Sequence, residues 1–189
     1  IARYLFNNSI SGFEYLYGIP GTIGGALYMN AGAFDKEILS HVHRIELLDH
    51  NGDPYYLKGK DLNYSYRKSN INKSSIIIGV EFYNHTKIFD KKILSNLDNK
   101  RKSSQPVNQL SCGCIFKNPP HKYASKLIEG AKLKGKRFGG IYISRKHSNY
   151  FINDGSGSFT DFLNLLDYVK RKVLSVYNIE LKEEVILIK

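Results

Sequence analysis

The sequence has few of the residues that commonly cross-link or anchor a protein: two cysteines, one methionine and no tryptophan among 189 residues. Two cysteines cannot build the disulfide framework of a small secreted domain, and they fit a reducing cytosol better. No apolar run approaches the roughly 20 residues that a membrane-spanning helix needs. The first residues also lack the apolar core and the small-residue cleavage site of a secretory signal. We therefore expect a cytoplasmic protein.

Acidic residues are also scarce: 17 aspartates and glutamates face 28 lysines and arginines, which leaves a net charge of +11. Such a field favours an anionic partner, whether a nucleic acid, an acidic membrane or a small phosphorylated ligand. The basic runs DKK, NKRK and VKRK lie in segments with helical periodicity, where lysine-rich faces are usually only solvated. Charge alone leaves these alternatives open.

The hydrophobic fraction of 42% is ordinary for a globular protein, and the periodicity divides the chain in two. Up to residue 85 the pattern is mostly that of strands, whereas a helical period begins at residue 86. We expect one domain over residues 1–85, a second over residues 86–189, and an α+β fold. The apolar stripe that opens the second domain consists of Ile88, Phe89, Ile93, Leu94 and Leu97.

The first domain contains an unusual glycine-rich stretch, residues 18–32. Its five glycines are too many for a regular element and suit a loop that brings backbone N–H groups close to a ligand, or a tight loop that only lets two elements pack. Before it, Ser11 and Glu14 have capping-box spacing, so we expect a short helix that ends at Gly18. The expected strands are 41–49, 53–58 and 74–83, the first two joined by a hairpin turn at Asn51-Gly52.

The second domain is predicted to alternate helices with short strands. Ser158 or Thr160 is placed to cap its longest helix, residues 161–177. The other elements we expect are helices over 86–104 and 123–131 and strands over 141–144, 149–153 and 184–188. The apolar stripe of the longest helix consists of Phe162, Leu165, Leu166, Val169, Val173 and Val176.

The stretch SCGCIFKNPP, residues 111–120, is typical of a short strand that ends in a polar corner. Strand alternation would put Cys112, Cys114 and Phe116 on one face. A thiol there is a candidate acid, nucleophile or metal ligand. Cys-x-Cys with His121 supplies too few ligands for zinc, so we expect no metal. The alternative is that Cys114 is a small buried hydrophobe, as most free cysteines are.

Other candidate polar residues are equally ambiguous when each is taken alone. Arg67 stands among tyrosines and suits bidentate binding of a carboxylate or phosphate, but it also fits a solvent-facing arginine. Glu184 begins the last expected strand beside another glutamate, which is typical of a surface. His147 and Asn149 fit simple turn residues.

Taken together, six segments carry a resemblance: GIPGTIGGALYMNAGAF, YSYRKS, RKSSQP, SCGCIFKNP, KLKGKRFGGIYISRKHSNYFIN and LKEEV. In this order, and over nearly the whole chain, they resemble the UDP-N-acetylenolpyruvoylglucosamine reductase family. The resemblance implies part of an FAD-binding domain of the PCMH (vanillyl-alcohol-oxidase-like) type, followed by an α+β substrate-binding domain. No large insertion follows YSYRKS, so the chain resembles the shorter subtype of the family.

The resemblance also implies the reaction: oxidoreductase chemistry in peptidoglycan precursor synthesis, which serves cell-wall biogenesis, cell shape and cell division. NADPH reduces FAD, and a hydride then passes to the enolpyruvyl double bond of UDP-N-acetylglucosamine enolpyruvate, which gives UDP-N-acetylmuramate. Neither a nucleic acid nor a membrane is implied as a partner, and we expect a monomer. The phosphates and carboxylate of these ligands would match a basic cleft.

Residue roles follow from the same resemblance. Arg67 and Glu184 match the polar pair at the substrate carboxylate, and Cys114 matches the proton donor, which leaves Cys112 as a packing residue. The candidate substrate contacts are Tyr66, Lys117, Asn118, His147 and Asn149. The candidate FAD contacts are Gly18, Ile19, Pro20, Gly21, Gly24, Gly25, Asn30, Ala31 and Gly32.

Two features depart from the family pattern. Cys114 stands where the family has serine; a thiol, with a pKa of about 8.5, is a stronger acid than an alcohol but a weaker hydrogen-bond donor. The chain also begins at Ile1 without the glycine-rich segment that holds the FAD pyrophosphate in the family, so we expect this chain alone to bind FAD weakly or not at all. Two alternatives therefore stay open: a non-catalytic remnant of such a reductase, and a basic nucleic-acid-binding module whose tyrosines stack on bases.

Overall fold

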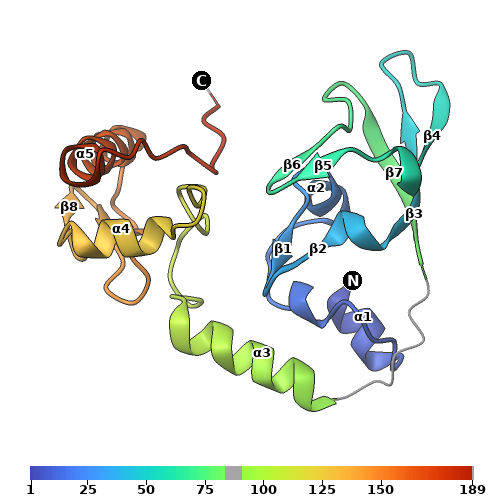
Figure 1. The fold of residues 1–189 in the computed structure, drawn as a ribbon, viewed down its shortest axis with the longest axis horizontal. Helices are drawn as coiled ribbons and strands as arrows, with labels where there is room; N and C mark the ends of the chain where they lie inside the picture. Colours follow the sequence, from blue (N-terminus) through green and yellow to red (C-terminus); the bar gives the residue numbers. More distant parts are fainter. Residues whose placement is uncertain (84–90, 189) are drawn as a thin grey trace. The chain divides into compact units, whose positions relative to one another are not determined.

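The computed structural model describes residues 1–83 and 91–188, which form two compact units with separate cores (Figure 1). The N-terminal unit is Ile1–Asn99, and the C-terminal unit is Lys100–Lys189. Both units combine helices with strands, which confirms the expected α+β class. The expected domain boundary between residues 85 and 86 lies outside the described residues and stays a prediction. Within the two described ranges, no helix has the length and apolar character needed to cross a bilayer.

An antiparallel sheet with the strand order β4-β3-β7 forms the centre of the N-terminal unit. Its strands are β3 (Val42–Leu48), β4 (Pro54–Lys58) and β7 (Ile76–Phe82). The predicted hairpin joins β3 to β4, and Gly52 in its turn has a φ of +88°. Ile45 of β3 is fully buried in the core of this unit.

Short elements surround this sheet. Two small hairpins pair β1 with β2 and β5 with β6. The short helices, 3-10 helices (η) and strands of this unit are α1 (Ala2–Asn7), η1 (Glu14–Leu16), α2 (Ile23–Tyr28), β1 (Gly32–Ala33), β2 (Lys36–Glu37), η2 (Ile38–His41), η3 (Gly59–Asp61), β5 (Tyr64–Ser65) and β6 (Lys68–Ser69).

Two expectations for the N-terminal unit are wrong. In place of an α-helix capped by Ser11 there is only the 3-10 turn η1, and the Glu14 carboxylate accepts the Gly12 N–H at 3.0 Å. The glycine-rich stretch is not irregular throughout, because it contains α2. Thr22 caps α2 by accepting the Gly25 N–H at 3.1 Å, and such a cap offsets part of the cost of glycine in a helix.

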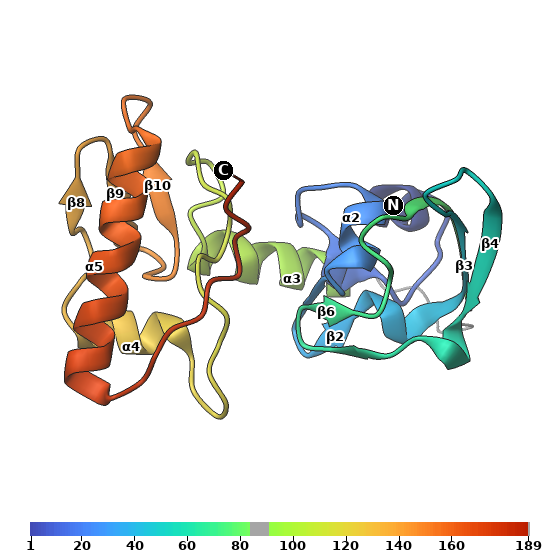
Figure 2. The ribbon, with the colours of Figure 1, turned by 90° about the horizontal axis from the view of Figure 1, so that it is seen from above.

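The C-terminal unit packs helices against an antiparallel sheet with the strand order β10-β9-β8 (Figure 2). The long helix α5 contacts β8, β9 and α4, and Ile128, Leu165 and Val169 are fully buried between these elements. The elements of this unit are α4 (Ala124–Gly130), β8 (Arg137–Phe138), β9 (Ile141–Ile143), β10 (Phe151–Asn153) and α5 (Phe159–Tyr177).

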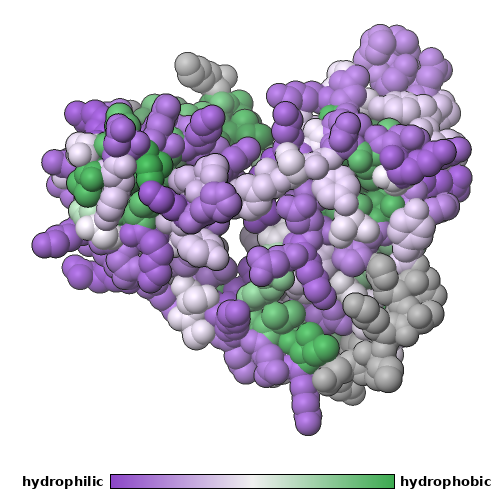
Figure 3. Space-filling view, in the orientation of Figure 1, coloured by the Kyte–Doolittle hydropathy of each residue, from purple (hydrophilic) through white to green (hydrophobic). Residues whose placement is uncertain are grey.

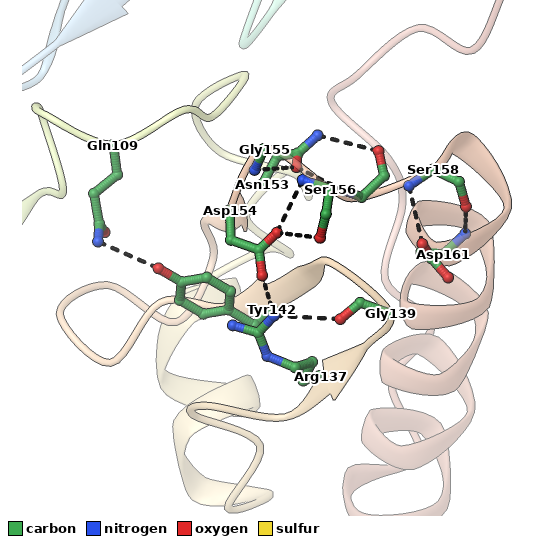
Figure 4. A network of polar contacts seen from close by, with 11 residues as sticks. Gln109, Arg137, Gly139, Tyr142, Asn153, Asp154, Gly155, Ser156, Ser158 and Asp161 are labelled. Carbon is green, nitrogen blue, oxygen red and sulfur yellow. Dashed lines mark hydrogen bonds and ion pairs between the residues drawn. The ribbon is translucent and has the colours of Figure 1, made fainter.

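Helix α5 forms largely as predicted. Ser158 is the N-cap, and it forms a reciprocal capping box with Asp161 (Figure 4). The expected stripe is buried or half-buried except at Val176, which is 56% exposed, so that part of the prediction is wrong. At this end of the helix Tyr177 packs against the core instead.

The last segment contradicts the sequence prediction. The expected strand 184–188 does not form; one isolated bridge joins Phe116 to Glu183, and Ile186 and Ile188 are exposed. The apolar run of residues 185–188 therefore predicts a strand, but the described residues pair with the 115–117 segment only up to Glu184.

Helix α3 (Lys91–Ser104) contributes residues to both units. In its predicted stripe, Leu97 packs against the core of the N-terminal unit, whereas Ile93 is 45% exposed. Ile88 and Phe89 lie outside the described residues. Hydrophilic side chains cover most of the face that Figure 3 shows, as expected for solvated basic faces.

Candidate active site

The SCGCIFKNPP segment is not a regular strand. Gly113 has a φ of +84°, which an extended strand does not allow, and only isolated bridges pair the segment. Ile115 and Phe116 are consecutive and both fully buried, so the expected alternation is wrong. The positive φ at Gly113 turns the chain between the two cysteines, and Cys112 is exposed rather than packed, contrary to expectation.

Two chain segments distant in sequence hold this stretch from either side. The Ile115 N–H donates to the Asn149 carbonyl at 2.9 Å, and the Glu184 N–H donates to the Ile115 carbonyl at 2.8 Å. The Asn149 side chain adds two bonds to Phe116, accepting its N–H at 3.0 Å and donating to its carbonyl at 2.8 Å. These bonds bring Cys114, Glu184 and the 147–150 turn together.

Four ionisable groups gather where these segments meet. Cys114 is half-buried and bridges to Tyr150, whose phenol is close enough to feel the charge of the Cys114 side chain. Burial raises the pKa of Tyr150 well above its usual value, and the charge of Cys114 raises it further. The charge of Glu184 also raises the pKa of Tyr150, whereas the charge of the buried Arg101 lowers it. The arrangement combines an acid, a carboxylate, a phenol and a guanidinium.

His147, one of the candidate substrate contacts, packs against Tyr150 of this group. Its ring stands edge-on to Tyr150 with ring centroids 4.8 Å apart. Burial lowers the pKa of His147, and the positive charge of Lys134 lowers it further, so the imidazole is neutral at pH 7. A neutral ring accepts as well as donates, and here Nδ1 accepts the Asn149 N–H at 3.3 Å.

The remaining substrate-contact candidates of this unit are near the same segment. Lys117 is half-buried, and its N–H donates to the Lys182 carbonyl at 2.9 Å. The exposed Asn118 accepts the Ala124 N–H at 3.0 Å and so satisfies a free donor at the start of α4. Asn149 is 2% exposed and engaged by Phe116 through both ends of its amide. Both asparagines therefore also have structural roles.

In the N-terminal unit, Arg67 occupies the turn between β5 and β6, with a φ of +56°. Its guanidinium donates to the Gly32 carbonyl at 2.9 Å and lies 4.8 Å from the centre of the Tyr66 ring. The structure thus brings the predicted catalytic arginine to the end of the glycine-rich stretch. Tyr66 itself is 43% exposed.

The second half of the glycine-rich stretch is built into the fold. Asn30 is fully buried, and its side chain bonds Glu37, the Ser65 carbonyl and the Leu39 N–H. A Cβ at Gly32 would lie 2.2 Å from the Lys36 carbonyl, so no other residue fits there. Ala31 between them is half-buried.

The first half of the stretch is open, and it fits the close approach of a cofactor. Gly18, Pro20, Gly21 and Gly25 are exposed, whereas Ile19 and Gly24 are half-buried. Gly21 has a φ of +133°, and no atom lies within 4 Å of the position of its missing Cβ. A flat or phosphorylated group can therefore reach the backbone of this loop directly.

The predicted catalytic residues fall into two groups. Cys114 and Glu184 meet within the C-terminal unit, whereas Arg67 belongs to the N-terminal unit together with the expected FAD contacts. Within the described residues of the C-terminal unit, an open groove of about 670 Å³ is lined by polar and basic side chains, but Cys114 is not among them. Its basic members are Lys102, Arg145 and Lys146. No group of three or more histidine, cysteine, aspartate or glutamate residues suited to a metal occurs in the described ranges.

Sequence reasoning missed two residues of this site. Arg101 lies in the basic run NKRK, which predicts a solvated face, yet it is 8% exposed and its charge acts on Tyr150. Tyr150 follows His147 and Asn149, which fit simple turn residues, and no local sequence pattern marks it as a site residue. Its role becomes visible only through the bridge to Cys114, 36 positions away (150 minus 114).

Comparison with known proteins identifies the family. The model of the "UDP-N-acetylenolpyruvoylglucosamine reductase, C-terminal domain" matches residues 105–188. The UDP-N-acetylenolpyruvoylglucosamine reductase of Fusobacterium nucleatum is 35% identical over 189 residues, and the chain covers 67% of its length. The chain belongs to the UDP-N-acetylenolpyruvoylglucosamine reductase family. The resemblance drawn from the six segments is thereby confirmed.

Other reductases of this family match over a similar extent. The Caldanaerobacter subterraneus reductase is 40% identical over 98% of the chain and 62% of its own length. The crystal structure of the Thermus caldophilus reductase superposes with a TM-score of 0.83 at 33% identity, and covers 97% of this chain and 66% of that one. The chain therefore spans 62–67% of the length of these reductases.

Proposed function

We propose that this chain carries the substrate-reducing site of a UDP-N-acetylenolpyruvoylglucosamine reductase in peptidoglycan precursor synthesis. The observation that supports this most is the meeting of Cys114, Glu184 and Tyr150 within one compact unit, in a family whose relatives are named for this reductase activity. The substrate is UDP-N-acetylglucosamine enolpyruvate, and the product is UDP-N-acetylmuramate.

The chemistry that the chain must supply is proton transfer and charge stabilisation. When bound, FAD would supply a hydride that originates from NADPH. Addition of a hydride to the terminal CH₂ carbon of the enolpyruvyl group leaves negative charge on the adjacent carbon and its carboxylate. The Cys114 S–H bond then breaks as a C–H bond forms at that carbon, and the thiolate that remains regains a proton from solvent.

Arg67 and Glu184 are the proposed polar groups at the substrate carboxylate. A guanidinium presents a planar array of N–H donors that matches a carboxylate. The interaction between the two groups strengthens as negative charge develops on the substrate. In this chain the Gly32 carbonyl and the Tyr66 ring hold the guanidinium, so its orientation is fixed before the substrate binds. Further substrate contacts are proposed for Tyr66, Lys117, Asn118, His147 and Asn149.

The cofactor would be held by the open part of the glycine-rich stretch. Gly18 to Gly25 are the residues whose backbone is accessible, and Gly21 leaves the most room for an approaching group. Asn30, Ala31 and Gly32 would act at the inner end, where Arg67 contacts the loop. The excess of basic residues, +11 overall, favours the approach of the two phosphorylated ligands to a cytoplasmic enzyme.

A direct test supplies the protein with a large excess of FAD, because the chain alone is expected to bind FAD weakly, and follows the conversion of UDP-N-acetylglucosamine enolpyruvate by NADPH with mass spectrometry. We expect a product heavier by two hydrogens, and in D₂O one deuterium from solvent on the carbon that Cys114 protonates. Absence of product from flavin-loaded protein, together with salt-sensitive binding of an oligonucleotide, would favour the nucleic-acid alternative. Absence of both would favour a non-catalytic remnant.

A further inference from the structure

Tyr150 is a polar neighbour of Cys114 in the C-terminal unit. The two residues face each other in an isolated antiparallel bridge, which puts their side chains on one face, and the charge of Cys114 acts on the phenol. The Ile115 N–H joins the two backbones by donating to the Asn149 carbonyl at 2.9 Å, and the Tyr150 N–H closes the 147–150 turn by donating to the His147 carbonyl at 3.0 Å. The contact is therefore part of the folded chain and does not depend on a ligand.

The Tyr150 ring is itself held in place. His147 stands edge-on to it at 4.8 Å, and the tyrosine is half-buried in the C-terminal unit. Its side chain has little freedom to turn away from the sulfur, since the His147 ring and the bridge restrict it from two directions.

We propose that Tyr150 is a positioning residue for Cys114: its hydroxyl donates a hydrogen bond to the sulfur, directs the S–H proton away from itself, and stabilises the thiolate that remains after proton transfer. This inference rests on the proposed function for its catalytic meaning. A sulfur that already accepts one hydrogen bond from the phenol points its own S–H toward the remaining open direction. After the S–H bond breaks, the same O–H group donates to the negative sulfur.

The charges around the pair are consistent with this direction of donation. Arg101, Glu184 and His147 are the other titratable groups that face Tyr150. Burial and the charge of Cys114 hold the proton on the phenol, so the hydroxyl is a donor throughout the neutral range. Arg101 adds a positive charge to the surroundings in which the thiolate forms.

The test measures the pH at which Cys114 becomes reactive, and it needs neither flavin nor substrate. In a Cys112→Ser background Cys114 is the only thiol, and its rate of alkylation by iodoacetamide follows the thiolate fraction. Tyr150→Phe keeps the ring and removes the hydroxyl. We expect the midpoint of the rate profile to rise by about one pH unit, the equivalent of one lost hydrogen bond.

Tyr168→Phe is the matched control, because it removes a hydroxyl from the same unit at a ring that packs on Phe138. It should leave the midpoint unchanged. Should Tyr150→Phe fail to fold, incorporation of 3-fluorotyrosine keeps the side chain and makes the phenol a stronger donor, so the midpoint should fall. A midpoint that neither substitution moves would overturn the inference.

Failure of this inference and failure of the proposed function give different results. If the midpoint rises in Tyr150→Phe but Cys114→Ala retains full substrate reduction, the pair exists and the proposed proton donor is wrong. If the midpoint stays constant while Cys114→Ala abolishes substrate reduction, the donor stands and Tyr150 does not position it.

Discussion

At the scale of the residue, the environment of each side chain decides what it can do, and the two cysteines illustrate this. Cys112 lies on the exposed side of the Gly113 turn, although partial shielding of its thiol raises its pKa. Cys114, two positions on, is half-buried against Tyr150 and shares its surroundings with Glu184. Only Cys114 is therefore set among groups that control a proton.

A titration prediction concerns Asp154, whose carboxyl has a pKa lowered to about 2 (Figure 4). The Ser156 hydroxyl donates to it at 2.7 Å, Arg137 pairs with it, and the Ser156 N–H donates at 3.0 Å. Because the folded pKa is below the unfolded value of about 3.9, the contribution to stability is present above that value and is lost as the pH falls toward 2.

Carbon-13 NMR of the Asp154 carboxyl checks this. We expect Ser156→Ala to raise the pKa, since the serine hydroxyl is the largest single cause of the shift. Ser175→Ala is the control, because that hydroxyl bonds the Lys172 carbonyl in α5. A carboxyl that titrates near its unfolded value in the unsubstituted protein would contradict the assignment.

At the scale of the element, α5 depends on its first turn. Ser158 accepts the Asp161 N–H at 3.1 Å, and the Asp161 carboxylate accepts the Ser158 N–H at 2.9 Å. We expect Ser158→Ala to lower the free energy of unfolding of the C-terminal unit by about 1 kcal/mol. Urea titration followed by the α5 amide signals would measure it. Ser175→Ala, near the other end of α5, should change stability by less than about 0.5 kcal/mol; equal effects of the two substitutions would contradict the capping role.

The elements that the sequence predicts well are those whose signal is local. The Asn51-Gly52 hairpin depends on one turn, and α5 on its own cap and stripe. The expected strand 184–188 failed because strand formation needs a paired neighbour and the isolated bridge lies at Glu183, and Val176 was misplaced because Tyr177 packs against the core at this end of α5. Contacts of long sequence separation, such as Asn149 with Phe116, leave no local pattern.

The candidate site divides in the same way. Family motifs predict Cys114, Glu184 and Arg67 as candidates, because each lies in a recognisable segment. The sequence did not predict Arg101 and Tyr150 as site residues. Arg101 lies in a basic run that resembles a solvated face, and the partner of Tyr150 is remote in the chain. Residues that act through another side chain are therefore the ones that sequence reasoning finds last.

At the scale of the whole molecule, the chain has two hydrophobic cores, one in each unit. Because each unit has its own core, we expect the two units to unfold in separate transitions. A core substitution should then destabilise only the unit that contains it. Ile45→Ala in β3 should lower the free energy of unfolding of the N-terminal unit by about 2–5 kcal/mol. Leu165→Ala in α5 should lower that of the C-terminal unit by the same amount. Calorimetry of the two variants would separate them; one transition shifted equally by both would contradict separate cores.

The two units also divide the proposed chemistry. Arg67 and the expected cofactor contacts belong to the N-terminal unit, and Cys114 and Glu184 belong to the C-terminal unit. A substitution at Cys114 should therefore leave the cofactor-binding part of the protein unaffected. The role of Cys114 as proton donor can therefore be tested without a change in cofactor binding.

The central claim is that Cys114 delivers the proton to the substrate carbon. Stopped-flow measurement of the flavin-loaded protein separates its reduction by NADPH from its reoxidation by UDP-N-acetylglucosamine enolpyruvate. We predict that Cys114→Ala slows the second step by about 10²–10⁴-fold and leaves the first unchanged, whereas Cys114→Ser retains turnover. An alanine variant that reduces the substrate at the unsubstituted rate would contradict the claim.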